Sequence, residues 1–223
     1  GEAWLLKALA RGWPVDPVVL DVGANEGHYC EGVLRQRPQA RLLAFEPHPQ
    51  THARLARRGA DRGFTAIQAA CGDSAGTLTL YDYAGQDGSS HASAYRDVLC
   101  GLRSSETSQV EVPVITLDET LQEYSFGHVE LLKIDTEGHE LSVLKGARKT
   151  LEARRIDVIQ FEFNEMNVYS RVFMRDFREL LQGYVLHRLL PDGLLPLSHY
   201  TPIEQELFAF QNIVAIREGV PVP

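Results

Sequence analysis

The sequence predicts an α/β fold in which a mostly parallel sheet is covered by helices. Short apolar runs alternate along the chain with segments whose apolar residues recur at helical spacing. Several of these runs end in a carboxylate and a turn residue, which is typical of buried parallel strands that open onto a helix. Because strands and helices alternate, right-handed crossovers should join the strands into one parallel sheet.

Length and composition favour one globular domain. The chain has 223 residues, of which 44% are hydrophobic and 23% are charged, and this is enough to build a sizeable core. We therefore expect a single domain over residues 1–223 that opens with a helical segment over residues 1–17. The formal net charge of -8 and the absence of any run of Lys or Arg argue against a nucleic-acid partner.

The cysteines favour a reducing compartment, and the hydropathy argues against a membrane span. Cys30, Cys71 and Cys100 are odd in number and form no C-x-x-C pair, so we expect neither a disulfide framework nor a zinc site. No run approaches the roughly 18 apolar residues of a membrane span, and the first residues lack the anatomy of a signal peptide. We expect a cytoplasmic protein without a membrane span.

A glycine-containing turn follows the first expected strand, residues 18–22. The turn holds Gly23, Asn25 and Gly27, and it resembles the dinucleotide-binding turn except at Asn25, where a middle glycine would let the backbone approach a pyrophosphate. A ligand without a pyrophosphate, such as S-adenosylmethionine, fits this turn better, and Asp21 at the strand end could meet its cationic parts. The alternative is a tight turn that needs its glycines for backbone geometry alone.

The next strand also ends in an acid. Apolar spacing predicts a helix over residues 29–34 that Pro38 stops, and then a strand over residues 41–45 that leads into Glu46. Glu46 lies 19 residues beyond Gly27, near the spacing at which an acid binds ribose hydroxyls. The alternative for Glu46 is a solvent-exposed carboxylate before a turn proline.

A third strand should lead to a further acid. We expect a helix over residues 50–58 that ends at Gly59, a natural C-terminal cap, and then a strand over residues 64–70. Asp73 follows this strand and is placed to contact the edge of an adenine. A simple Asx turn is the alternative, since the Gly-Asp-Ser sequence favours one without any ligand.

A small ribbon should come next. Residues 77–81 and 110–115 alternate apolar and polar side chains, as half-buried strands do. The polar segment between them, residues 84–109, predicts a mobile lid on the substrate side, with simple disorder as the alternative. Thr116 and Glu119 then form a capping box that begins a short helix.

The densest polar cluster follows the strand expected over residues 129–135. Four ionisable residues gather at its carboxyl end: Asp135, Glu137, His139 and Glu140. A helix over residues 140–151 should come next, since its apolar residues share one face.

The closing elements complete the sheet. We expect a strand over residues 156–164 that carries Glu162 near its end and a helix over residues 173–182. Residues 184–190 and 207–216 should then form an antiparallel hairpin at the edge of the sheet.

Four short motifs together resemble the FkbM family of S-adenosylmethionine-dependent methyltransferases. They are LDVGANEG at residues 20–27, AFEP at 44–47, LKIDTEGHE at 132–140 and LKGA at 144–147. The resemblance implies a Rossmann-like seven-stranded class I methyltransferase sheet, mostly parallel with an antiparallel edge hairpin, plus a small β-ribbon insertion. It also implies transfer of a methyl group to a hydroxyl of a sugar, glycan or natural product.

The resemblance also implies roles for particular residues. Asp21, Gly23, Asn25 and Gly27 look like the turn that holds the amino-acid tail of S-adenosylmethionine. Glu46 looks like the ribose ligand, and Asp73 looks like the adenine contact. Asp135, Glu137 and His139 match the family's motif beside the transferable methyl group, and Asp135 is counted with the cofactor ligands as well.

Alcohols are poor nucleophiles at neutral pH, so a base should remove the proton of the acceptor hydroxyl. His139 is the first candidate because its ordinary pKa is nearest the working pH, and Asp135 is the second. In another interpretation, Asp135, Glu137 and Glu162 hold a divalent metal that acidifies the hydroxyl. Lys133 lies inside a buried strand and should pair with Asp135 or Glu162.

Two other functions fit the sequence less well. An NAD(P)-dependent oxidoreductase is disfavoured by Asn25, which replaces the middle glycine of the dinucleotide turn. A non-catalytic protein that binds S-adenosylmethionine is disfavoured by the intact acid cluster after residue 134. We therefore expect an enzyme whose partner is a small-molecule or carbohydrate hydroxyl.

Overall fold

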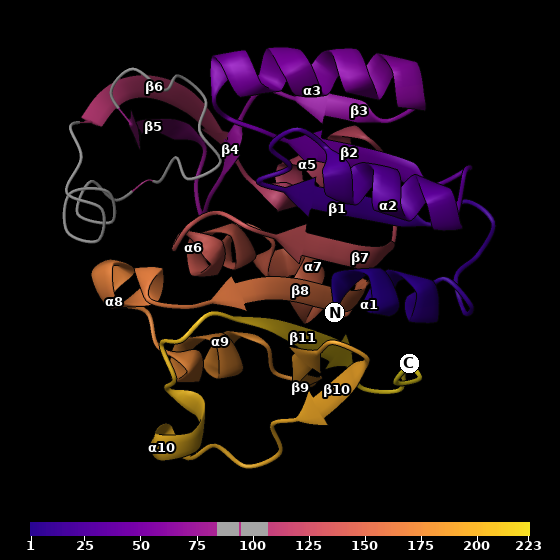
Figure 1. Cartoon of the computed structure of the whole chain (residues 1–223), viewed down its shortest axis with the longest axis vertical. Coiled ribbons are helices and arrows are strands. Elements are labelled where there is room, and N and C mark those ends of the chain that lie inside the picture. Colours follow the sequence, from indigo (N-terminus) through magenta and orange to yellow (C-terminus); the bar gives the residue numbers. More distant parts are fainter. Residues whose placement is uncertain (84–93, 95–106) are drawn as a thin grey trace.

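The computed structural model describes residues 1–83, 94 and 107–223. An eight-stranded sheet forms its centre, with the strand order β10-β9-β11-β8-β7-β1-β2-β3 (Figure 1). The strands are β1 (Val18–Val22), β2 (Arg41–Phe45), β3 (Thr65–Ile67), β7 (Val129–Ile134), β8 (Ile156–Phe163), β9 (Tyr184–Leu190), β10 (Gly193–Pro196) and β11 (Gln211–Arg217). Neighbours from β3 to β8 pair in parallel, whereas β11 runs antiparallel to both β8 and β9. The expected mostly parallel α/β sheet is confirmed.

The sheet has one strand more than expected, and its edge is built differently. Residues 193–196 fold back on β9 as the additional strand β10, so β9 and β10 form the antiparallel edge hairpin. The last strand, β11, inserts between β8 and β9 instead of forming the edge. This strand begins at Gln211 rather than at residue 207. The helix α10 (Pro202–Gln205) and a loop occupy the residues before it.

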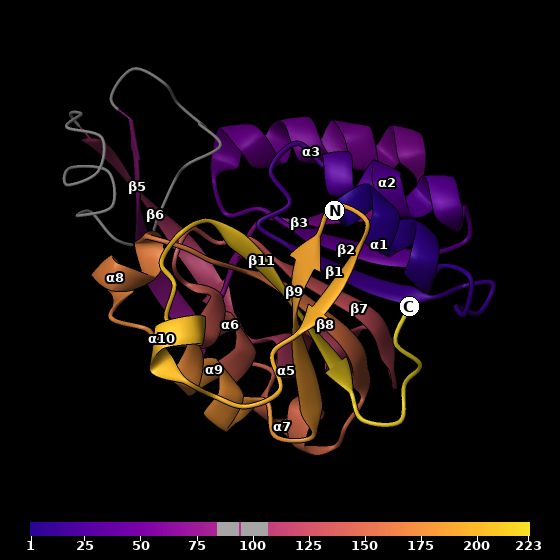
Figure 2. The same ribbon diagram turned by 60° about the horizontal axis from the view of Figure 1, so that its bottom comes forward.

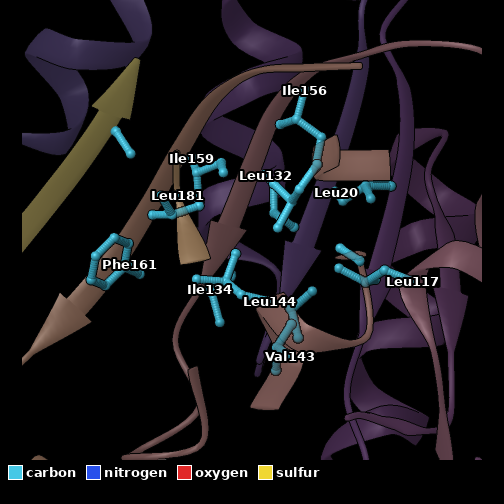
Figure 3. Close-up of a cluster of buried hydrophobic side chains, with 14 of the residues drawn as sticks. Leu20, Leu117, Leu132, Ile134, Val143, Leu144, Ile156, Ile159, Phe161 and Leu181 are labelled. Carbon is cyan, nitrogen blue, oxygen red and sulfur yellow. The ribbon is translucent and has the colours of Figure 1, made fainter. Parts of the chain in front are cut away.

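Helices cover both faces of the sheet, as Figure 2 shows. One face carries α1 (Glu2–Leu9), α2 (His28–Gln36) and α3 (Pro49–Arg62). The other carries α5 (Leu117–Glu123), α6 (Glu140–Lys145), α7 (Arg148–Glu152) and α9 (Met174–Leu180). Within the strands, Val19 and Leu131 pack in the hydrophobic core under α1, α2 and α3. Leu20 and Leu132 pack in the core on the other face, part of which is drawn in Figure 3. This alternation is the period of two that a strand imposes.

Two expected helices have different bounds in the structure, and each contains or ends at a glycine that makes a close contact. Helix α3 continues past Gly59 to its cap at Gly63, whose φ is 92°. Gly59 lies inside this helix, and a Cβ there would lie 2.6 Å from the carbonyl oxygen of Phe64. The helix expected over residues 140–151 breaks into α6 and α7 at Gly146, where a Cβ would lie 2.0 Å from the carbonyl oxygen of Gly72.

The segment expected as one strand over residues 64–70 divides between two sheets. Residues 65–67 form β3 beside β2, and β4 (Ala70–Cys71) joins a separate three-stranded sheet with β5 (Gly76–Tyr83) and β6 (Thr107–Ile115). This sheet is the expected ribbon, and it projects beside α3 in Figure 1. Of the segment expected as a lid, residues 84–93 and 95–106 lie outside the described residues, as does Cys100.

Of the short helices, α1 and α9 were expected from the sequence and α8 was not. The expected N-terminal helix is present as α1, and α9 follows Phe173, whose backbone N–H donates to Oδ2 of Asp176. The unexpected helix α8 (Met166–Ser170) follows β8. In the part of the chain that is described, no helix is both long and apolar enough to cross a membrane.

Candidate active site

A cleft opens at the carboxyl ends of β1, β2 and β7. About 630 Å³ of space lies between its walls, part of it open to solvent. Its polar wall consists of Asn25, Glu46, Asp135, Thr136, Glu137 and His139, and its apolar wall includes Phe45, Ala69, Ala70, Cys71, Leu78 and Leu80. Ligands of open α/β sheets bind at this edge, so the cleft is the candidate active site.

The turn after β1 brings two strand ends together. Gly23 has a φ of 80°, and a Cβ there would lie 1.7 Å from the carbonyl oxygen of Asp135. Only glycine allows β1 and β7 to approach this closely. Gly27, with a φ of 82°, lies away from the cleft, and a Cβ on it would lie 2.8 Å from Cδ1 of Leu55. Gly23 therefore lines the cleft, whereas Gly27 packs α2 against α3.

Glu46 is a buried hydrogen-bond acceptor at the end of β2, only 8% exposed. Its Oε1 accepts the backbone N–H of His48 at 2.8 Å, and its Oε2 accepts the backbone N–H of Asn25 at 3.1 Å. Burial raises the pKa of Glu46 to about 7, although both hydrogen bonds and the charge of Arg54 oppose the rise. Glu46 is therefore fixed between the loops that follow β1 and β2.

Asp21 does not line the cleft. Its carboxylate is 2% exposed, accepts the thiol of Cys30 at 3.0 Å, and sits on β1 opposite Lys133 of β7. Burial raises the pKa of Asp21 to about 6, and the positive charge of Lys133 limits the rise. Cys30 and Cys71 are both free and buried.

Lys133 lies beneath the cleft and contacts Asp135. Its ammonium donates to Oδ2 of Asp135 at 3.0 Å, lies 3.8 Å from Glu2 of α1, and is 5.5 Å from the ring centre of Tyr29. Burial alone would lower the pKa of Lys133, but Asp135, Glu2 and Asp21 together raise it. The expected pairing of Lys133 with Asp135 is present, and it holds the carboxylate of Asp135 at the edge of the cleft.

His139 lines the cleft from the N-terminus of α6. A Cβ on Gly72 would lie 3.6 Å from its Nε2, so the imidazole packs beside the chain that leaves β4. Burial lowers the pKa of His139, and the charge of Asp73 partly opposes this. The imidazole is therefore neutral near pH 7 and able to accept a proton.

Asp73 lies outside the cleft. Its backbone N–H donates to Oγ of Ser142 at 3.3 Å, and Asp73 lines two other pockets instead. The cause is the turn of the chain into the ribbon at β4, which carries residue 73 past the cleft wall. Cys71, two residues earlier, lines the cleft instead.

The residues of the metal interpretation do not converge. Glu137 and Asp135 line the cleft, whereas Glu162 does not. Burial, and then the neighbouring charge of Asp135, raise the pKa of Glu162, whose Oε2 accepts the amide of Asn164 at 3.3 Å. Among the described residues, no three His, Cys, Asp or Glu side chains are grouped so that they could hold a metal ion.

Two features of this site were not predicted from the sequence. Leu78 and Leu80 of the ribbon form part of the apolar wall. The alternation of apolar and polar residues around them predicted a strand, but it did not predict that this strand would lie beside the cleft. Glu140 is buried behind the cleft and accepts hydrogen bonds from the loop before it. Its place in the LKIDTEGHE motif was visible in the sequence, but its partners were not.

The order of the strands is that of a Rossmann-like class I methyltransferase fold. Strand β11 lies between β8 and β9 and runs antiparallel to both. A solved structure, described as the methyltransferase FkbM of Methylobacillus flagellatus KT, has a TM-score of 0.55 to this chain at 15% identity. The similarity covers 91% of this chain and 44% of that one. The model of the methyltransferase FkbM domain matches residues 21–186, so the chain belongs to the FkbM methyltransferase family.

Three curated relatives carry names that describe methyltransferases. Methyltransferase sdnD of Sordaria araneosa is 33% identical over 158 residues, which cover 60% of this chain and 61% of sdnD, less than two thirds of its length. 2-O-methyltransferase NoeI of Sinorhizobium fredii is 26% identical over 192 residues, 80% of this chain and 76% of NoeI. Hexuronic acid methyltransferase AglP of Haloferax volcanii is 26% identical over 184 residues, 81% of this chain and 68% of AglP.

Proposed function

We propose that the chain is an S-adenosylmethionine-dependent O-methyltransferase that acts on a hydroxyl of a sugar, glycan or natural-product small molecule. The observation that carries the proposal is that Glu46, Asp135 and His139 line one cleft at the ends of β2 and β7. Family membership supports methyl transfer as the reaction. The name of NoeI supports transfer to an oxygen, and the name of AglP supports a sugar as the acceptor.

The residues of the cleft fit S-adenosylmethionine. Glu46 is a buried acceptor that borders the cleft, and each of its oxygens accepts one backbone hydrogen bond and has the capacity to accept another. Two ribose hydroxyls would supply donors of the right kind. Phe45, Leu78 and Leu80 offer apolar surface for the adenine. When bound, S-adenosylmethionine supplies an electrophilic methyl group on its sulfonium.

The residues at the end of β7 would act on the acceptor. Asp135, fixed by Lys133, offers a carboxylate that can orient the acceptor hydroxyl by accepting its hydrogen bond. His139 takes the proton of that hydroxyl as its oxygen attacks, since burial lowers the pKa of His139 and keeps the imidazole in the neutral form that can accept a proton. Holding the oxygen in line with the methyl group converts the encounter into an effectively unimolecular step.

Binding experiments test the cofactor part of this proposal. Calorimetry should detect binding of S-adenosylmethionine and S-adenosylhomocysteine and none of NAD. Release of S-adenosylhomocysteine with a panel of sugars and macrolide-type alcohols then tests the reaction and finds the acceptor. Tight binding of NAD without affinity for either adenosyl compound would overturn the proposal, and adenosyl binding without transfer to any alcohol would favour a non-catalytic binding protein.

A further inference from the structure

The loop between β7 and α6 folds around one buried carboxylate. Glu140 is the first residue of α6 and is 1% exposed. Its Oε1 accepts the backbone N–H of Thr136 at 3.0 Å, the hydroxyl of Thr136 at 3.1 Å and the backbone N–H of Gly138 at 3.1 Å. Three hydrogen bonds from the loop therefore meet at a single oxygen atom.

The backbone of this loop is strained at the residue between the two N–H donors. Glu137 has a φ of 53°, and Gly138 has a φ of 102°. A residue with a Cβ rarely adopts a left-handed conformation unless its surroundings impose it. Thr136 and Gly138, on either side of Glu137, are both bound to Glu140. These hydrogen bonds can impose the conformation that carries Glu137 to the cleft.

We propose that Glu140 is a positioning residue that holds Glu137 and His139 at the cleft through the loop formed by residues 136–139. Glu137 and His139 line the cleft, whereas Glu140 lies behind the loop and does not. The effect of Glu140 on turnover rests on the proposed methyl transfer. Its effect on the shape of the loop does not, so the two can be tested separately.

The cost of burying Glu140 supports a role beyond stability. Burial raises the pKa of Glu140 to about 7 even though the loop N–H groups stabilise its charge. Its second oxygen, Oε2, is buried and has no hydrogen-bond partner among the described residues. A buried charged group with incomplete partners often stabilises a fold less than an apolar side chain of similar volume. The contacts of Glu140 instead fix the shape of the loop formed by residues 136–139.

Hydrogen exchange measures the loop directly. In Glu140→Ala, the amides of Thr136 and Gly138 should exchange about tenfold or more faster, because each loses its acceptor. In Glu140→Gln they should stay near wild type, since the side-chain oxygen can still accept. The matched control is Glu130→Ala at the other end of β7, where Oε2 of Glu130 accepts the N–H of Val18. Equal exchange of the two loop amides in Glu140→Ala and Glu130→Ala would overturn the inference.

The imidazole of His139 gives a second readout that does not need activity. Burial lowers the pKa of His139 in the wild type, and an NMR titration, assigned with His139→Gln, can follow it. In Glu140→Ala the pKa should return toward its ordinary value as the loop opens. Glu140→Gln removes the charge but keeps the acceptor, so it should leave the burial effect in place. An unchanged pKa in Glu140→Ala would contradict the inference.

Turnover tests the link to the reaction. For an alcohol that the wild type methylates, Glu140→Ala should lower kcat by about 100-fold and change the affinity for S-adenosylhomocysteine by less than about threefold, because Glu46 is untouched. Wild-type kcat in a folded Glu140→Ala with an opened loop would overturn the positioning role. If Glu140→Ala does not fold, Glu140→Asp, which keeps the charge but shortens the reach, should show the same fast exchange. If the wild type methylates nothing, the proposed function fails, while exchange and titration still decide the inference about the loop.

Discussion

The backbone N–H of Asn25 donates to Oε2 of Glu46 at 3.1 Å, which ties the loop after β1 to the carboxyl end of β2. The other oxygen of Glu46 accepts the N–H of His48 at 2.8 Å. Each carboxylate oxygen can accept a further hydrogen bond. One side chain thus shapes two loops and can also bind a pair of vicinal hydroxyls in the cleft.

Glu46→Ala should weaken the binding of S-adenosylhomocysteine. Hydrogen bonds to a buried charged acceptor contribute about 2–3 kcal/mol, so the dissociation constant should rise by about 30- to 150-fold. Calorimetry measures this change. Glu31→Ala on α2, which removes surface ion pairs with Arg58 and Arg62, is the control and should stay within about twofold. Equal affinities in the two variants would contradict the role of Glu46.

The binding of S-adenosylhomocysteine should depend on pH through Glu46. Burial raises the pKa of Glu46 to about 7, so the carboxyl group becomes protonated as the pH falls through 7 and loses acceptor capacity. Affinity should therefore be full at pH 8 and about tenfold weaker at pH 6 if only the ionised form binds. Glu46→Gln should abolish this part of the dependence. The same slope in wild type and Glu46→Gln would assign the titration to another group.

Gly23→Ala should destabilise the fold more than Gly63→Ala. Both glycines are left-handed, with φ values of 80° and 92°. At Gly63 an added Cβ meets nothing within 4 Å, so only the backbone cost of about 1–2 kcal/mol applies. At Gly23 it would lie 1.7 Å from the carbonyl oxygen of Asp135, and the loss should be about 3 kcal/mol or more. Denaturant unfolding measures both, and similar losses would refute the close approach of β1 and β7.

His139→Ala should lower turnover and leave cofactor binding almost unchanged. Loss of a general base typically reduces kcat by about 10²- to 10⁴-fold. His128→Ala is the control, because His128 precedes β7 at its opposite end and pairs with Asp157 at 3.0 Å. Steady-state kinetics on an accepted alcohol would measure the effect. Full turnover in His139→Ala would move the role of base to Asp135.

Local patterns in the sequence predicted much of this fold. The runs expected as strands at residues 18–22, 41–45 and 129–135 form the buried strands β1, β2 and β7, the last of which ends at residue 134. Burial on both faces of a sheet leaves such mainly apolar runs. Carboxylates that follow parallel strands share one edge of a sheet, and this is why Glu46 and Asp135 line one cleft.

Contacts between distant residues account for what the sequence did not predict. Gly146, where α6 ends, packs against the carbonyl of Gly72, and no local pattern contains that contact. Asp21, like Asp135, is a carboxylate near the carboxyl end of a parallel strand, yet it lies buried beside Cys30. Asp73 misses the cleft because the chain turns into the ribbon before reaching it. Gly146 and the chain before Asp73 thus contact residues that lie far away in the sequence, Gly72 and strand β6.

Methyl transfer itself is the most direct test of the central claim. The protein is incubated with S-adenosylmethionine that carries a deuterated methyl group and with the panel of sugars and other alcohols, and the products are analysed by mass spectrometry. The account predicts a deuterated methyl group on an oxygen of one class of acceptor, with one S-adenosylhomocysteine formed per product and a much lower yield with His139→Ala. Binding of S-adenosylhomocysteine without methylation of any acceptor, or a methyl group on nitrogen or carbon, would contradict it.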